Sequence, residues 1–404
     1  MLTRIAWRNI WRNKGRSAVV VGAMIVGIWA LSFGGSFMRS FLTGYIASSI
    51  KHETSNGQVH HPEFAKDQDI NFTLRNPDSL VQEIEKNPAI KDICERSIVN
   101  GMISSSRQAT GVEIIGVDPE DESRVTELNS LIIDGAYFTN VSSNPVLVGE
   151  KLAEKLKVGI KSKVVLTFQD VDGNITAARF RVAGIIHASS VQINEATAYV
   201  IRTDLNTLLG LPGAAHEIAF TTVEGTDDAN LTKVLSEQLP DDKIEYWGEL
   251  SPGLIFMQQW MGASLQMLIV IIMLALAFGI VNTMLMAVLE RIRELGVLMA
   301  LGMSRGRIFI MIMFETIFLS TVGGPLGLII GYSTVSYLNE RGIDLRNYSE
   351  GLEAFGYDSI LYPSLHAIDY LQIVIGVLVT ACLASLYPAW KAIRLEPVQA
   401  IHTI

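Results

Sequence analysis

Cysteine and charge are both scarce in this sequence. Only 2 of the 404 residues are cysteine, which excludes a disulfide-stapled scaffold and a zinc site with four thiolate ligands. Charged residues make up 18% of the chain, against about 25% in typical soluble domains. Acidic residues outnumber basic ones by 41 to 32. The chain therefore lacks the basic excess of a nucleic-acid-binding protein, and no nucleic acid is expected among its partners.

The motifs of the common catalytic sites are also missing. The sequence has no G-x-x-x-x-G-K-[ST] loop to hold nucleotide phosphates, no H-E-x-x-H zinc motif and no G-x-S-x-G nucleophile turn. The His60-His61 pair has no further ligand at helical spacing, so a solvated loop is favoured over a metal site. We expect no enzyme activity, no metal and no cofactor in this chain.

Long apolar runs take the place of the missing charge. A ~30 Å hydrocarbon layer requires about 20 apolar residues in a helix, and residues 17–38 alone contain 22 without a charge. A backbone in lipid must satisfy its own hydrogen bonds, which favours helices. Transmembrane helices are expected at 17–42, 263–289, 307–338 and 367–390. The first run is longer than a signal-peptide core, so a retained anchor is favoured.

The distribution of charge orients these helices. Segments 1–16, 290–307 and 391–404 together hold 11 basic and 3 acidic residues, whereas residues 40–264 hold 18 basic and 31 acidic residues. The positive-inside rule then places both termini and the middle loop in the cytoplasm. The expected organisation is a cytoplasmic segment 1–16, an extracytoplasmic domain 43–262, a cytoplasmic segment 290–306, an extracytoplasmic loop 339–366 and a cytoplasmic tail 391–404.

The first sixteen residues form a pattern of their own. Trp7 and Trp11 are four residues apart, and Arg4, Arg8 and Arg12 form a row at the same spacing. Tryptophan rings and arginine side chains in such a pattern are typical of a helix lying in the headgroup layer. We predict an interfacial helix in which these five residues anchor the chain to the membrane surface.

The extracytoplasmic domain has the pattern of an α+β fold. Helical stretches at 78–86, 149–156 and 227–239 alternate with strand-like stretches at 98–104, 112–117, 164–168 and 179–182. Strands mixed with short helices favour two small lobes over one large doubly wound sheet. The fold class is therefore a membrane α-helical protein of four transmembrane helices with a large two-lobed α+β extracytoplasmic domain.

Polar residues inside the spans are few. Glu315 lies eight residues past Arg307, roughly 12 Å deep at 1.5 Å per residue, and Asn282 is a second intramembrane polar residue. A buried carboxylate could serve a proton relay, or it could pair with helix ends or reach the cytoplasmic interface, and the second role is favoured. Gly327 and Gly331, four residues apart, allow close helix approach.

The cytoplasmic segment after the second span begins with charges and ends with aliphatic residues. A solvated turn explains the charges but not the apolar residues that follow. Those residues either dock on something or extend the third helix inward.

Two cytoplasmic motifs resemble a known family. The segment 290–304, ERIRELGVLMALGMS, is similar to the loop after the second span in MacB/FtsX-type (type VII) ABC permeases, and 387–401, YPAWKAIRLEPVQAI, resembles their closing motif. Within the extracytoplasmic domain, 111–120, 134–138 and 146–153 resemble the lipoprotein-releasing LolC/LolE type. The order of spans agrees as well, so the resemblance covers nearly the whole chain.

This resemblance implies a permease subunit in the bacterial inner membrane, with its large domain in the periplasm and a second lobe at about 130–200. It implies a separate ABC ATPase, which binds ATP and Mg²⁺, and a second permease subunit, identical or homologous. Movements of the periplasmic domain then act on a lipoprotein or another periplasmic substrate. The alternatives are MacB-like export and FtsX-like regulation of a cell-wall hydrolase. The expected ATPase-coupling residues are Glu290, Arg291, Arg293, Glu294, Leu295, Gly296, Leu298, Leu301 and Gly302.

Overall fold

The computed structural model describes residues 2–12, 14–139, 141, 143–188, 190–345 and 360–394. Within these residues the chain divides into two compact units. The helical unit contains residues up to 42, from 259 to 345 and from 360 onward, and the α/β unit contains residues 43–258. Most of the predicted tail, 395–404, and the centre of the predicted loop, 346–359, lie outside the described residues.

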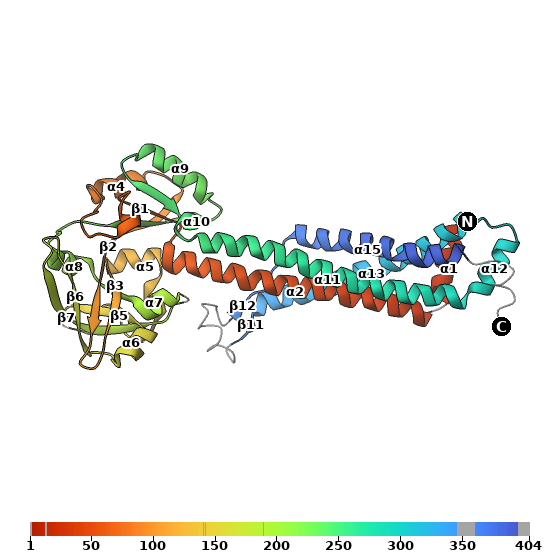
Figure 1. The fold of residues 1–404 in the computed structure, drawn as a ribbon, viewed down its shortest axis with the longest axis horizontal. Coiled ribbons are helices and arrows are strands. Elements are labelled where there is room, and N and C mark those ends of the chain that lie inside the picture. Colours follow the sequence, from red (N-terminus) through yellow and green to blue (C-terminus); the bar gives the residue numbers. More distant parts are fainter. Residues whose placement is uncertain are drawn as a thin grey trace. The chain divides into compact units, whose positions relative to one another are not determined.

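Six helices of the described residues build the helical unit (Figure 1). They are α1 (Leu2–Arg12), α2 (Lys14–Ser49), α11 (Pro252–Glu290), α12 (Ile292–Ala300), α13 (Arg305–Arg341) and α15 (Ala367–Ile393). Two short strands, β11 (Ile343–Asp344) and β12 (Ile360–Leu361), pair antiparallel. Of the described helices, α2, α11, α13 and α15 are each long and apolar enough to cross a membrane. The prediction of four membrane-spanning helices is confirmed.

The long helices extend beyond the apolar runs. α2 continues past the predicted end at residue 42 to Ser49, and α11 begins at Pro252, before the predicted start at 263. Proline suits the first position of a helix because its missing N–H would have no partner there. In α2, the rings of Phe37 and Phe41 stack 6.1 Å apart at helical spacing. The hydropathy of the sequence predicts which part of a helix can lie in the hydrocarbon layer. It does not predict where the helix itself ends.

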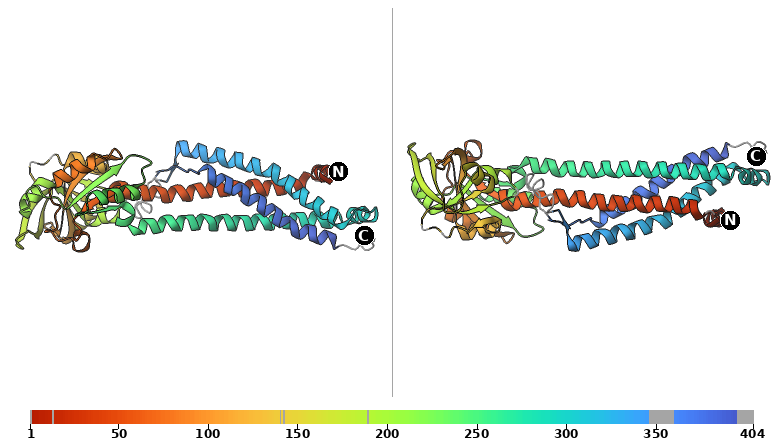
Figure 2. Two further views of the ribbon diagram at one scale, coloured as in Figure 1. Left: turned by 90° about the horizontal axis from the view of Figure 1, so that it is seen from above. Right: turned by 90° about the horizontal axis from the view of Figure 1, so that it is seen from below.

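Small residues let α13 approach α2 closely. A Cβ atom at Gly327 would lie 2.9 Å from the Cβ of Ile28, and one at Gly331 would lie 2.8 Å from the hydroxyl of Ser32. Figure 2 shows α2, α11, α13 and α15 as one bundle of helices within this unit. The glycine spacing therefore serves a contact inside the chain.

The α/β unit is built on one connected sheet. Ten strands of the described residues pair in the order β10-β1-β9-β2-β3-β8-β5-β7-β4, and β6 pairs with both β2 and β7. The strands are β1 (Gly57–His60), β2 (Ile90–Ser104), β3 (Ala109–Val117), β4 (Ile132–Gly135), β5 (Pro145–Gly149), β6 (Lys163–Gln169), β7 (Ile175–Ile186), β8 (Thr197–Ile201), β9 (Glu217–Thr222) and β10 (Lys243–Tyr246). The helical segments are η1 (Ile50–Thr54), α3 (Phe64–Asp67), α4 (Pro77–Glu85), α5 (Pro119–Val125), η2 (Leu128–Leu131), α6 (Glu150–Leu156), α7 (Val191–Ala196), α8 (Arg202–Leu209), α9 (Asp228–Gln238) and α10 (Trp247–Leu250).

The long strand β2 joins two lobes. Its first half pairs with β9, in the lobe that contains β1, β10, α4 and α9. Its second half pairs with β6, and the pairings β2-β3-β8-β5-β7-β6 return to β2 as a closed barrel. Alternating apolar residues of these strands fill the barrel, including Phe180 and Ile114. The prediction of an α+β domain of two lobes is confirmed, and the two lobes share one sheet.

Candidate functional site

The predicted coupling segment folds as a helix of its own, α12, at one end of the helical unit. Gly302 adopts φ +93°, a left-handed conformation that glycine reaches without strain. The amide of Met303 donates to the carbonyl of Leu298, and the amide of Gly302 donates to that of Met299, both at 3.0 Å. These two bonds form a Schellman motif, which ends the helix. The alternative in which 295–303 extend the third membrane helix is wrong, because α13 starts only at Arg305.

The two faces of α12 differ sharply. Leu295 and Gly296 are buried against the helical unit. The exposed positions recur at spacings of three and four residues, which places them on one stripe of the helix. Val297 and Leu301 on this stripe are apolar, and Leu301 is 80% exposed. The exposed stripe thus begins with charged residues and ends with aliphatic ones, a pattern also found in helices that dock into apolar grooves.

A buried carboxylate holds the start of α12 in place. Glu315 of α13 is buried and accepts hydrogen bonds from Asn9 Nδ2 at 2.6 Å and from Arg291 Nη1 at 3.3 Å. Arg291 also donates from Nε to Glu294 at 3.1 Å. Because Asn9 belongs to α1, this single carboxylate connects α1, α12 and α13. Of the two alternatives, pairing with groups at helix ends describes this geometry better than an isolated proton carrier.

A second ion pair, which is exposed to solvent, also connects α1 to α12. Arg12 at the end of α1 forms an ion pair with Glu294 of α12, and both side chains are about half exposed. Exposed ion pairs contribute only about 0–1 kcal/mol, whereas breaking a buried pair costs about 3–5 kcal/mol. The Glu315 carboxylate is therefore the stronger of the two connections.

The predicted interfacial helix packs on α13. Ala6 is fully buried in the core of the helical unit, and the ring of Trp7 meets that of Phe318 edge to face at 5.7 Å. Trp7 and Trp11 are both exposed on their outer sides, as are Arg4 and Arg8. Membrane anchoring by these residues stays a prediction.

The remaining predicted residues lie apart from the buried network. Glu290, Arg293 and Gly302 are exposed, Leu298 is half-buried, and Asn282 is exposed on α11. Two residues that sequence reasoning missed belong to the site. Val297 could have been found from its helical spacing to Leu301, but no local signal marks Asn9, whose partner is 306 residues away.

This arrangement joins α1, α12 and α13 through one buried carboxylate. Among the described residues, no cluster of three or more His, Cys, Asp or Glu side chains could hold a metal ion. A protein seated on Val297 and Leu301 would instead displace α12, and the Glu315 network would carry that displacement into α1 and α13.

Replacing Glu315 with alanine is expected to loosen α12. Arg291 would keep its mostly buried position without its buried carboxylate, so local opening becomes easier. We expect amide exchange within 292–300 to rise about tenfold or more in the full chain in lipid nanodiscs. Arg12→Ala, which removes only the exposed pair with Glu294, serves as the control and should stay close to the unmodified protein. Equal exchange in the two variants would contradict the role given to Glu315.

Both units of the chain match known protein families. Residues 17–237 match the family described as MacB-like periplasmic core domain, and residues 267–397 match the family described as FtsX-like permease C-terminal. The chain is 22% identical to the lipoprotein-releasing system transmembrane protein LolE of Haemophilus influenzae over 82% of each chain. It is 24% identical to the pyoverdine export ATP-binding/permease protein PvdT of Pseudomonas syringae pv. syringae, over 98% of this chain and 58% of that protein.

A solved structure is similar as well. The periplasmic region of MacB from Actinobacillus actinomycetemcomitans matches with a TM-score of 0.36 and 13% identity, over 52% of this chain and 97% of that one.

Proposed function

Because this chain belongs to the family of MacB- and FtsX-like ABC-type permeases, we propose that it couples ATP hydrolysis in a partner subunit to movements of its α/β unit. This proposal rests on the exposed stripe of α12, which ends in Leu301. Glu315 holds the start of the same helix through its hydrogen bond from Arg291. An ATPase seated on this stripe would move α12. Because α13 continues as a candidate membrane span, the movement would pass into the membrane.

The ATPase is proposed to be a separate chain. PvdT is described as ATP-binding and permease in one protein, and this chain spans 58% of it. The 404 residues here contain no G-x-x-x-x-G-K-[ST] loop, whose backbone amides would hold the nucleotide phosphates. ATP and Mg²⁺ would then bind to the partner. A second permease subunit, identical or homologous, would complete the transporter.

The proposed substrate is a lipoprotein in the outer leaflet of the inner membrane. The similarity to LolE extends over 82% of that protein and 82% of this chain, so the two share almost their whole organisation. In this arrangement the α/β unit lies in the periplasm. Two other functions, export as in PvdT and regulation of a cell-wall hydrolase, use the same coupling geometry and differ in what the α/β unit binds.

Mass spectrometry of proteins that co-purify with the tagged chain in mild detergent distinguishes these functions. We expect an ATPase subunit, a permease subunit and acylated lipoproteins. An ATPase with an export adaptor or a wall hydrolase would retain the coupling function and replace the substrate. Recovery of no ATPase, under conditions in which a known transporter of this class stays intact, would overturn the coupling proposal itself.

A further inference from the structure

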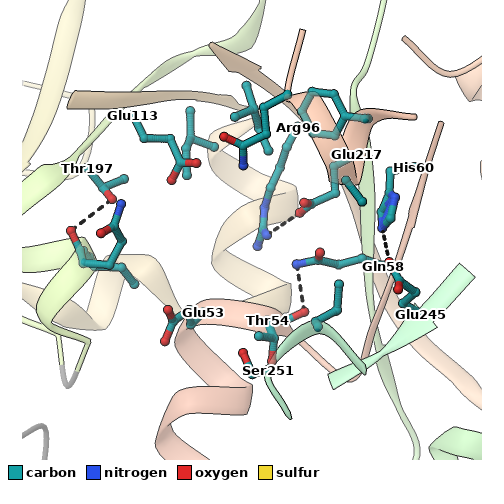
Figure 3. Close-up of a pocket in the computed structure, with 18 of the residues that line it drawn as sticks. Glu53, Thr54, Gln58, His60, Arg96, Glu113, Thr197, Glu217, Glu245 and Ser251 are labelled. Carbon is teal, nitrogen blue, oxygen red and sulfur yellow. Dashed lines mark hydrogen bonds and ion pairs between the residues drawn. The ribbon is translucent and has the colours of Figure 1, made fainter. Parts of the chain in front are cut away.

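The α/β unit contains an open cavity that the coupling function leaves unused. Its volume is about 490 Å³, within the ~300–1,000 Å³ typical of small-molecule sites. Both lobes line it (Figure 3): β1, β9 and β10 from one lobe, β3 and β8 from the barrel, and η1 and α7 beside them. A ligand here would touch both lobes at once.

The lining has more acceptors than donors. Its two cationic side chains are already engaged: Arg96 with Glu122 and Glu217, and Lys243 with Glu245 at 2.7 Å. Three further carboxylates in the wall form no ion pair with any described residue. They belong to Glu53, Glu113 and Glu249. Figure 3 shows the first two on opposite sides of the open space.

Glu113 is the least exposed of these three residues. Burial raises its pKa, and the nearby charge of Glu217 raises it further, while Arg96 acts in the opposite direction. The anionic form of Glu113 is thus poorly stabilised by the protein alone. A cation in the cavity would stabilise it.

His60 lines the same wall and adds no positive charge to it. Its side chain is buried, with the residue 3% exposed, and its Nε2 lies 2.9 Å from a carboxylate oxygen of Glu245. Burial lowers the pKa of His60 despite the Glu245 charge, so the ring is neutral near pH 7. With its proton at Nε2 donated to Glu245, Nδ1 is an acceptor, and it has no hydrogen-bond partner among the described residues.

We propose that this cavity binds a ligand bearing a primary ammonium group, of the size of a lysine side chain. An ammonium group offers three donors and no acceptor and is more compact than a guanidinium, which suits a wall of carboxylates. Binding would join the two lobes and would require neither an ATPase nor the substrate proposed above.

Titration calorimetry of the full chain in nanodiscs with Nα-acetyl-lysine amide tests this proposal. We expect binding to the unmodified chain and a dissociation constant about tenfold or more higher for Glu113→Gln, because one charge-assisted contact is lost. The matched control is Glu237→Gln. Glu237 is an exposed residue of α9, so this substitution removes the same charge outside the cavity. The neutral analogue Nα-acetyl-2-aminoheptanoic acid amide, in which a methyl group replaces the ammonium, has the same shape but no charge, and it should not bind.

Three results would overturn the proposal. They are no heat of binding at millimolar probe, equal affinity for the probe and its neutral analogue, or equal weakening by Glu113→Gln and Glu237→Gln. Unchanged amide exchange in β3 shows that Glu113→Gln is folded, so a loss of affinity reports on the site itself.

Discussion

Replacing Leu301 with aspartate is expected to release the ATPase from the purified complex. Leu301 is 80% exposed at the end of the α12 stripe, and full burial of a leucine side chain contributes about 1.5–3 kcal/mol. An aspartate in its place would also bring an unpaired charge into the interface. The dissociation constant should therefore rise about 100-fold or more, as measured by retention of the ATPase through size-exclusion chromatography.

Ile175 offers a matched control for this substitution. It is 81% exposed in β7 of the α/β unit, so Ile175→Asp makes the same chemical change at the same exposure. That variant should retain the ATPase. If Leu301→Asp keeps the ATPase, the stripe of α12 is not the ATPase contact, and the coupling role moves elsewhere.

Local patterns predicted most of the elements because each pattern reports on its own neighbourhood. The apolar runs indicated four spans, and the periodicity of 227–239 indicated the helix observed as α9. The charged start and aliphatic end of 290–303 are compatible both with a docking helix and with an extension of the third span. This pattern does not decide between them, because the left-handed Gly302 and the hydrogen bonds of the Gly302 and Met303 amides end α12.

Contacts between distant residues were beyond such patterns. The depth of Glu315 followed from counting residues, but its partners did not, because Arg291 reaches it from outside the span and Asn9 from the opposite end of the sequence. The dual pairing of β2 with β9 and β6 likewise depends on tertiary packing. The cavity exists only because β2 holds two lobes side by side, so no stretch of sequence carries a signal for it.

Replacing Arg96 with methionine is expected to destabilise the α/β unit by about 3–5 kcal/mol at pH 7.5. The Arg96 side chain is 6% exposed and donates to both oxygens of Glu122, at 2.9 and 2.7 Å, and to Glu217 at 2.8 Å. Without it, two buried carboxylates face each other unpaired. Pulse proteolysis of the full chain in urea would measure the change. Arg124→Met removes a 55% exposed arginine from its pair with Asp121 and should cost at most about 1 kcal/mol.

The Arg96→Met variant and the unmodified chain should differ less in their free energy of unfolding as the pH falls. Burial by itself raises the pKa of Glu122, but Arg96 brings it below its ordinary value, so its contribution to stability is unchanged between pH 7.5 and 5.5. Burial keeps the pKa of Glu217 raised even beside Arg96. In the variant both pKa values lie above those of the unfolded chain, so folding takes up protons and stability increases toward low pH.

We therefore expect the difference in free energy of unfolding between the two chains to be smaller by about 1 kcal/mol or more at pH 5.5 than at pH 7.5. A difference that is constant with pH would show that the loss comes from packing around the missing side chain. Because β2 carries Arg96 at the junction of the two lobes, a smaller difference at pH 5.5 would show that the charges of this buried cluster contribute to the stability of the junction.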